Sequence, residues 1–150
     1  MTDIKTKEDR SKNMSAIHSK NTKPELYLRK LLFSQGFRYR NNVKNIVGHP
    51  DIYLAKYNTV IFVNGCFWHR HKECKYAYMP KSRVEFWNNK FTNNINRDYK
   101  VKTELERAGI KCLIVWECTV KKMMKSEEER IKTLDCIMQF LICGDIYKEI

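Results

Sequence analysis

The sequence lacks any apolar stretch close to the ~20 residues that a membrane-spanning helix needs. Its polar N-terminal region also lacks the apolar segment of a secretory signal peptide. There is no internal repeat, no low-complexity linker and no stripe typical of a coiled coil. These absences argue against membrane and secreted proteins, and they predict a monomer with a single folded domain over residues 21–150. Residues 1–20 are polar and basic and are predicted to form a flexible arm.

Acidic residues are scarce outside the C-terminal region. The 150 residues carry 29 Lys and Arg against 17 Asp and Glu, a net charge of +12. Residues 126–150 have a net charge of −3, so the first 125 carry +15, and residues 67–99 hold eight of the eighteen aromatic side chains. Basic groups attract phosphates and aromatic rings stack on bases, so nucleic acid is the leading predicted partner. A solvated basic surface beside an ordinary aromatic core is the alternative.

The apolar pattern predicts an α/β fold with a mixed central sheet flanked by helices. Four strands are expected, at residues 37–40, 51–55, 59–64 and 110–116. The short link at residues 56–58 favours a hairpin between the second and third. The strand at 110–116 is the most apolar, which predicts a place at the centre of the sheet.

Two capping boxes mark the expected helix starts. Thr22 with Glu25 should open a first helix that ends near Gly36, and Ser82 with Glu85 should open a long helix. The long helix is expected to end at Gly109. A last amphipathic helix is predicted over residues 127–141.

Two cysteines and two histidines fall within the nine residues from Cys66 to Cys74. Structural zinc is held by four Cys and His ligands in a tetrahedron, often a local group with one distant partner. Cys118, after the 110–116 strand, could be that partner, while spacing alone does not decide between His69 and His71. Free thiols with incidental histidines are the alternative. The remaining cysteines are expected to be small buried apolar residues: Cys112, Cys136 and Cys143.

Asp51 follows Pro50 at the start of a predicted strand. In metal-dependent nucleases an Asp in such a position binds Mg²⁺, although Pro-Asp also fits a plain turn. Two further acids have structural interpretations, because Glu25 fits the capping box and Asp98 could be a solvated charge on the long helix.

Six strings occur in collinear order over about residues 10–143. They are Arg10-Ser11-Lys12-Asn13-Met14, Pro50-Asp51, Gly65-Cys66-Phe67-Trp68-His69, Glu85-Phe86-Trp87, Arg97-Asp98 and Leu113-Ile114-Val115-Trp116-Glu117-Cys118. Through these strings the chain resembles the very-short-patch repair (Vsr) endonuclease family. The resemblance implies a restriction-endonuclease-like three-layer fold and a Mg²⁺-dependent nick 5′ to a thymine mispaired with guanine. Such mismatches arise when 5-methylcytosine is deaminated. It also implies a bacterial, cytoplasmic enzyme that is nucleoid-associated when it is bound to DNA.

The resemblance implies a role for each matching residue. Asp51 would hold Mg²⁺, His69 would activate the attacking water, and Glu25 and Asp98 would organise the hydrated metal. The implied structural zinc ligands are Cys66, His71, Cys74 and Cys118. The implied DNA contacts are Phe67, Trp68 and Trp87 as a wedge from one groove, Met14 inserted from the other, and Arg10, Lys12 and Asn13 on the arm. Unstacking is cheapest where base pairing is already faulty.

The sequence departs from the family pattern at two points. Asn64 stands where well-known members have a histidine near the metal, and Asn can orient a water but cannot carry a proton. The interval between His71 and Cys74 has one extra residue. In addition, no Glu-x-Lys follows Asp51, which excludes lysine-based restriction-enzyme chemistry and leaves His69 as the local base.

Two other functions compete with this interpretation. One is a zinc-stapled DNA-binding module without catalysis, which has no use for Asp51 or His69. The other is a nicking nuclease of the same fold with a different target. Mismatch-repair proteins are a possible further partner, while the sequence does not specify the flanking bases that are read around the mismatch.

Overall fold

The computed structural model describes residues 21–150 and contains a five-stranded mixed sheet. Its strands, in spatial order, are β1 (Arg40–Asn41), β2 (Ile52–Leu54), β3 (Thr59–Asn64), β4 (Lys111–Trp116) and β5 (Tyr147–Glu149). The first three strands are antiparallel neighbours, while β3, β4 and β5 are parallel. The fourth strand is therefore interior and buried, but β3 rather than β4 holds the central place.

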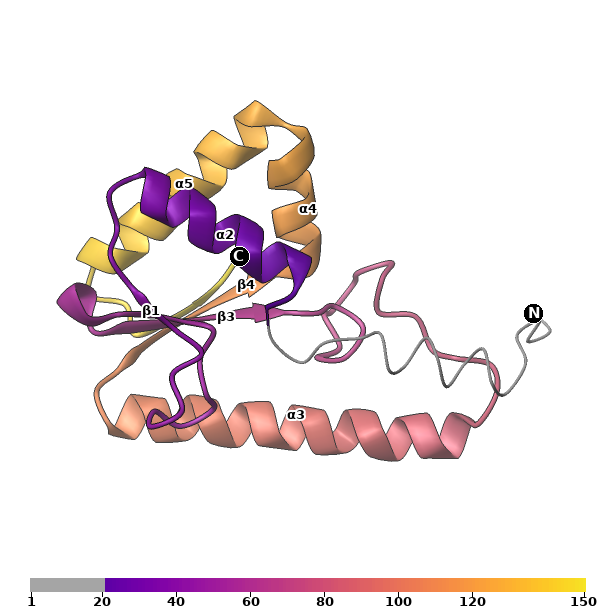
Figure 1. Ribbon diagram of the computed structural model, residues 1–150. Coiled ribbons are helices and arrows are strands. Elements are labelled where there is room, and N and C mark those ends of the chain that lie inside the picture. Colours follow the sequence, from indigo (N-terminus) through magenta and orange to yellow (C-terminus); the bar gives the residue numbers. More distant parts are fainter. Residues whose placement is uncertain (1–20) are drawn as a thin grey trace.

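Helices cover both faces of the sheet, in three layers (Figure 1). One face carries the long α3 (Val84–Arg107), which connects the parallel strands β3 and β4. The other face carries α2 (Lys23–Ser34), α4 (Glu117–Lys125) and α5 (Glu127–Ile142). The predicted α/β architecture with a mixed, helix-flanked sheet is confirmed.

Alternation along β3 and β4 builds one core on each side of the sheet. Ile61, Leu113 and Val115 are fully buried and belong to a cluster that includes Leu28 of α2 and Phe140 of α5. The neighbouring positions on the strands face the opposite side, because successive side chains of a strand point to opposite faces. The buried cluster on that side includes Leu105 of α3 and consists of Val60, Cys66, Leu105, Cys112, Ile114 and Trp116.

The structure confirms the predicted first helix and the predicted hairpin. Thr22 caps α2 by accepting a hydrogen bond from the Glu25 amide at 3.4 Å. The Glu25 carboxylate, however, accepts from the amide of Asn21 rather than Thr22, so only half of the capping box forms. The β2–β3 hairpin turns through Ala55–Tyr57 and a left-handed Asn58.

Other expectations were wrong. Arg83, in a left-handed conformation and without a side-chain cap, precedes α3, so Ser82 does not cap it. Of the predicted strand 37–40 only Arg40 is in a strand, and α4 and β5 had no prediction. Cys112 is buried as expected, whereas Cys143 is exposed.

None of the helices in residues 21–150 is long and apolar enough to cross a membrane.

Candidate active site and metal centre

The five residues predicted to be catalytic line one cavity of about 1200 Å³ between α3 and the sheet. They come from five different parts of the chain: Glu25 from the first turn of α2, Asp51 from the residue before β2, Asn64 from the end of β3, His69 from the following loop, and Asp98 from the middle of α3. The fold therefore brings together side chains that are up to 73 positions apart in the sequence.

Asp51 is fixed at the start of the hairpin and carries an electrostatically costly charge. Its Oδ2 accepts a hydrogen bond from the Val63 amide at 2.7 Å. Burial, and then the negative charge of Glu25, raise the pKa of Asp51 from its ordinary 3.8 to about 7, against the opposing effects of the Val63 amide and Arg29. Two carboxylates that resist joint ionisation form a natural site for a cation, because a cation relieves their repulsion.

His69 is held in one orientation by Asp98. Its Nδ1 lies 2.6 Å from Asp98 Oδ2, so the carboxylate fixes the ring and leaves Nε2 for other chemistry. Asp98 is thus a partner of His69 rather than a solvated helix charge. Asn64 is nearly buried and lines the same cavity. A histidine oriented by a carboxylate is suited to act as a general base.

Sequence reasoning missed Arg29, which is buried on α2 next to Glu25. The guanidinium NH2 lies 3.0 Å from Glu25 Oε2. The available signal was the spacing of Glu25 and Arg29, four positions apart on a predicted helix, which places them on the same face.

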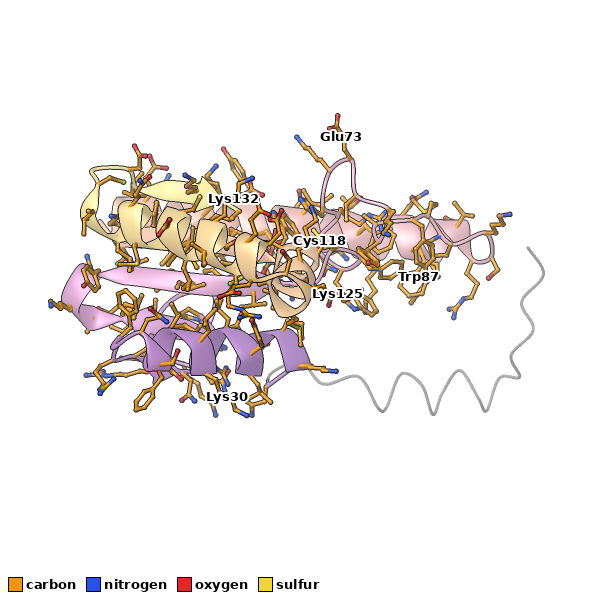
Figure 2. The ribbon with its side chains drawn as sticks, turned by 90° about the horizontal axis from the view of Figure 1, so that it is seen from above. Lys30, Glu73, Trp87, Cys118, Lys125 and Lys132 are labelled. Carbon is orange, nitrogen blue, oxygen red and sulfur yellow. The ribbon has the colours of Figure 1, made fainter. Side chains whose placement is uncertain are left out.

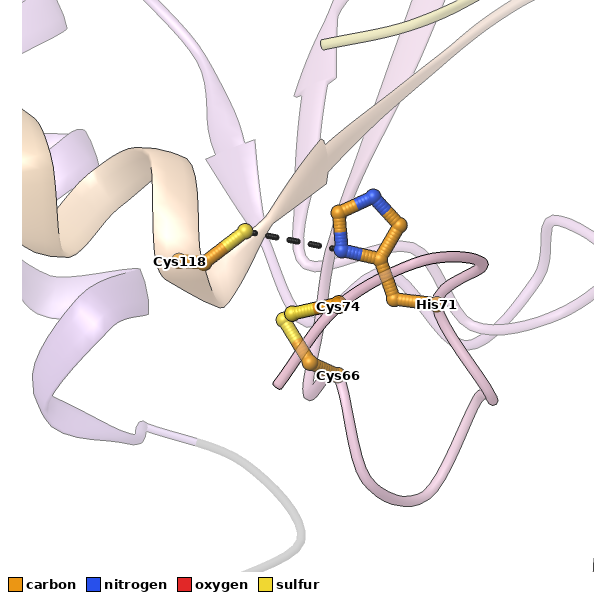
Figure 3. Close-up of side chains that lie close together, drawn as sticks. All are labelled: Cys66, His71, Cys74 and Cys118. Carbon is orange, nitrogen blue, oxygen red and sulfur yellow. Dashed lines mark hydrogen bonds between the residues drawn. The ribbon is translucent and has the colours of Figure 1, made fainter. Parts of the chain in front are cut away.

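A second cluster, of thiols and imidazole (Figure 3), adjoins the cavity through His71, which also lines the cavity. The ligand atoms of Cys66, His71, Cys74 and Cys118 all lie within 4.8 Å of one another, and Cys118 Sγ is 3.5 Å from His71 Nδ1. It is His71 that joins this cluster, while His69 faces Asp98. The extra residue before Cys74 does not keep its sulfur out of the group.

The chemistry of this cluster suits a metal ion. Burial raises the pKa of the Cys66 thiol to about 12, a cost that a bound cation removes by holding the thiolate. Burial lowers the pKa of His71 and so favours the neutral imidazole that binds metals. The His71 ring stacks on Trp116, with centroids 4.2 Å apart and planes at 7°. Four such donors at this spacing could hold a metal ion.

The three predicted wedge aromatics form one cluster. Phe67 contacts Trp68 and Trp87 edge-to-face, with centroids 5.1 and 5.4 Å apart, and it packs on the buried Phe91. Figure 2 shows Trp87 on the part of α3 that projects past the other helices. Arg70 braces the cluster, since its guanidinium lies 3.9 Å above the Phe91 ring. The predicted DNA contacts of the arm lie outside the described residues: Arg10, Lys12, Asn13 and Met14.

Comparisons with known proteins agree on one family. The family model described as DNA mismatch endonuclease Vsr matches residues 2–76. The DNA mismatch endonuclease Vsr of Escherichia coli K12 is 37% identical over 145 residues, which cover 97% of this chain and 90% of that protein. The type II nicking enzyme V.NmeAIP of Neisseria meningitidis is 55% identical over 121 residues, 81% of this chain and 86% of that enzyme. A type II nicking enzyme of Xanthomonas oryzae, V.XorIIP, is 38% identical over 135 residues, 90% of this chain and 98% of that enzyme.

Proposed function

Because the chain belongs to the Vsr DNA mismatch endonuclease family, we propose that it nicks one strand of duplex DNA on the 5′ side of the thymine in a T:G mismatch. The observation that carries this proposal is the cavity in which Asp51 and Glu25 lie with the His69–Asp98 pair. A DNA-binding module without catalysis has no need for a strained carboxylate pair or an oriented histidine.

The residues of the cavity divide the chemistry among them. Asp51, with one oxygen bound by the Val63 amide, would hold Mg²⁺, and Glu25 would help to organise the hydrated ion. When bound, Mg²⁺ supplies Lewis-acid activation of the scissile phosphate and stabilises the charge of the transition state. His69 takes the proton of the attacking water, and Asp98 holds the ring and stabilises the imidazolium. Asn64 orients water without carrying a proton.

Zinc is the ion that best fits three thiolates and one imidazole. Cys66, His71 and Cys74 lie in the loop that carries His69, and Cys118 lies in the first turn of α4. The ion would therefore staple the catalytic loop to the end of β4. The aromatic cluster continues from this loop, where Phe67, Trp68 and Trp87 wedge beside the mismatch and Met14 inserts from the other groove.

A nicking assay tests the proposal on labelled duplexes that differ only at one base pair: T:G, T:A and C:G. We expect Mg²⁺-dependent nicking of the T:G duplex alone, at the bond 5′ to the mispaired thymine. Replacing His69 by Ala should abolish nicking and leave duplex binding nearly intact, because that variant loses the base but keeps the wedge. Equal nicking of all three duplexes would refute mismatch recognition, and equal nicking by wild type and the His69 variant would refute the role of His69.

The similarity to type II nicking enzymes favours a second candidate, the same chemistry in a different flanking sequence. A panel of T:G duplexes with varied neighbouring base pairs separates the two candidates. Nicking in a single context would identify the flanking bases that the enzyme reads. The monomeric state and any contact with mismatch-repair proteins remain predictions.

A further inference from the structure

Arg29 is one of the few buried charged residues in the described chain and lies at the junction of three segments. Its side chain is 5% exposed. One terminal nitrogen, NH1, donates to Asn21 Oδ1 at 2.8 Å. The other, NH2, lies within hydrogen-bond distance of Glu25 Oε2 at 3.0 Å, Asn42 Oδ1 at 3.1 Å and the Asp51 carbonyl at 3.3 Å. The guanidinium therefore ties α2 to the residue that follows β1 and to the residue before β2.

The bonds of Arg29 act on the two carboxylates of the cavity in different ways. Glu25 is held directly through Oε2, which also accepts from the Asn21 amide at 2.8 Å. Asp51 is held through its backbone, since its carbonyl accepts from Arg29 and from the Asn42 amide at 3.2 Å. In each carboxylate one oxygen is engaged, at Glu25 Oε2 and Asp51 Oδ2, and the second has no hydrogen-bond partner among residues 21–150.

The burial of Arg29 is hard to explain by stability alone. Desolvating an ion pair costs about as much as the pair regains, so a buried salt bridge is weak support for a fold. Within residues 21–150 the Nε–H of Arg29 is shielded from solvent and has no hydrogen-bond partner, which adds to the cost. A costly buried cation beside two catalytic carboxylates points to a role in the site.

We propose that Arg29 is a positioning residue of the active site, whose planar guanidinium sets the distance and orientation between Glu25 and Asp51 for the hydrated Mg²⁺. This inference rests on the proposed function, because it assumes that these two carboxylates act on the metal. Arg29 contacts neither substrate nor metal. It acts through the carboxylates, as partners of metal ligands commonly do.

Positioning and simple electrostatics predict opposite results when Arg29 is replaced. If Arg29 were only a positive charge near the metal, its removal would reduce repulsion and tighten Mg²⁺ binding. If it positions the carboxylates, its removal should weaken Mg²⁺ binding and nicking by about 10–100-fold, the range seen for outer partners of metal ligands. The sign of the change in Mg²⁺ affinity therefore distinguishes the two roles.

Isothermal titration calorimetry with Mg²⁺ on the full-length, zinc-loaded protein tests the proposal at pH 8.5, well above the raised pKa of Asp51. The variants are Arg29→Met, which removes charge and hydrogen bonds, and Arg29→Lys, which keeps the charge but loses the planar fork. Lys30→Met is the matched control, because Lys30 is the next residue on α2 and points away from the molecule (Figure 2). We expect weaker Mg²⁺ binding in both Arg29 variants, unchanged binding in the control, and partial recovery of nicking at high Mg²⁺.

Zinc content and duplex binding without Mg²⁺ show whether each variant is folded, and they should match wild type. If Arg29→Met does not fold, the folded Arg29→Lys variant decides the question. Wild-type or tighter Mg²⁺ affinity in a folded Arg29 variant would overturn the proposal. A wild-type protein that binds Mg²⁺ but does not nick T:G duplexes would instead refute the proposed function, so the two failures are distinguishable.

Discussion

Replacing Asp51 by Asn should make the protein more stable while it abolishes nicking. Burial and the neighbouring Glu25 raise the pKa of this carboxyl from 3.8 to about 7 in the metal-free protein. A carboxyl with a raised pKa in the folded state favours folding most when it is protonated, at low pH. Its contribution to the free energy of unfolding is lost progressively as the pH rises from about 4 to about 7. In this range the carboxyl ionises in the unfolded chain, which stabilises the unfolded state, while it stays protonated in the folded protein.

The size of the effect follows from the two pKa values. The interval between 3.8 and about 7, at ~1.4 kcal/mol for each pKa unit, corresponds to about 4 kcal/mol above pH 7. Asn resembles the protonated carboxyl in shape, and its carbonyl oxygen can still accept the bond from the Val63 amide. The Asn variant should therefore gain little near pH 4 and up to about 4 kcal/mol at pH 8.

Urea unfolding over pH 5–9, with zinc retained and no Mg²⁺ added, measures this difference. The advantage of the Asn variant should grow with pH up to about pH 7 and then level off. Asp135→Asn, an exposed replacement on α5, controls for the loss of one negative charge. A gain that is absent, independent of pH or opposite in sign would refute the argument. Added Mg²⁺ should stabilise wild type and not the variant, which would reduce the gain.

Three further predictions test other parts of the structure. Cys118→Ser should lower the zinc content and the Tm, measured by mass spectrometry and calorimetry; full zinc occupancy would contradict the proposed ligand set. Trp87→Ala should weaken binding to a T:G duplex by about 1–3 kcal/mol, the range for base–aromatic stacking. Fluorescence titrations measure the Kd, and an unchanged Kd would exclude Trp87 from the wedge. Lys111→Met should lower the free energy of unfolding, measured with urea, by about 1–2 kcal/mol, because Lys111 Nζ donates to the Leu141 and Cys143 carbonyls at the end of α5. Equal stability of wild type and variant would contradict this helix cap.

The elements predicted best are those whose own residues determine them. The run Thr59–Asn64 is rich in β-branched and apolar residues and forms β3 with the predicted bounds. Thr22 and Pro24 mark the start of α2 by local geometry alone. In both cases the signal lies within a few residues of the structure that it specifies.

The elements that were missed depend on contacts distant in sequence. The strand β5 is short and polar, and its position depends on hydrogen bonds to β4 from the residues on either side of it. The Cys112 amide of β4 donates to the Ile146 carbonyl, and the Ile150 amide donates to the Ile114 carbonyl of β4, at 2.8 Å each. The helix α4 is only nine residues long, and Val120 and Met123 bury it against the core. In the predicted strand at residues 37–40, Phe37 packs on the core but does not pair with a neighbouring strand.

The candidate site shows the same division between residue chemistry and tertiary context. Residue types and spacing predicted thiol and imidazole ligands but left His69 and His71 open, and the family resemblance implied His71. The fold places His71 in the cluster and His69 beside Asp98. The role of Arg29 was not predicted, because an arginine on an amphipathic helix is normally exposed. Its burial follows from the positions of Asn42 and Asp51, which lie on other segments.

One strand pairing connects the Cys/His cluster with the cavity that holds the candidate catalytic residues. In the parallel register of β3 and β4, Asn64 pairs with Trp116 at the ends of the two strands. Cys66 follows Asn64 by two residues and Cys118 follows Trp116 by two residues, so the register that aligns the strands also brings the two thiols together. Asn64 lines the candidate active-site cavity at the same point. A slip of one residue would turn the side chains of a strand to the opposite face, which would separate the thiols and remove Asn64 from the cavity. The buried pairing of β3 with β4 therefore positions both the Cys/His cluster and the candidate active-site cavity.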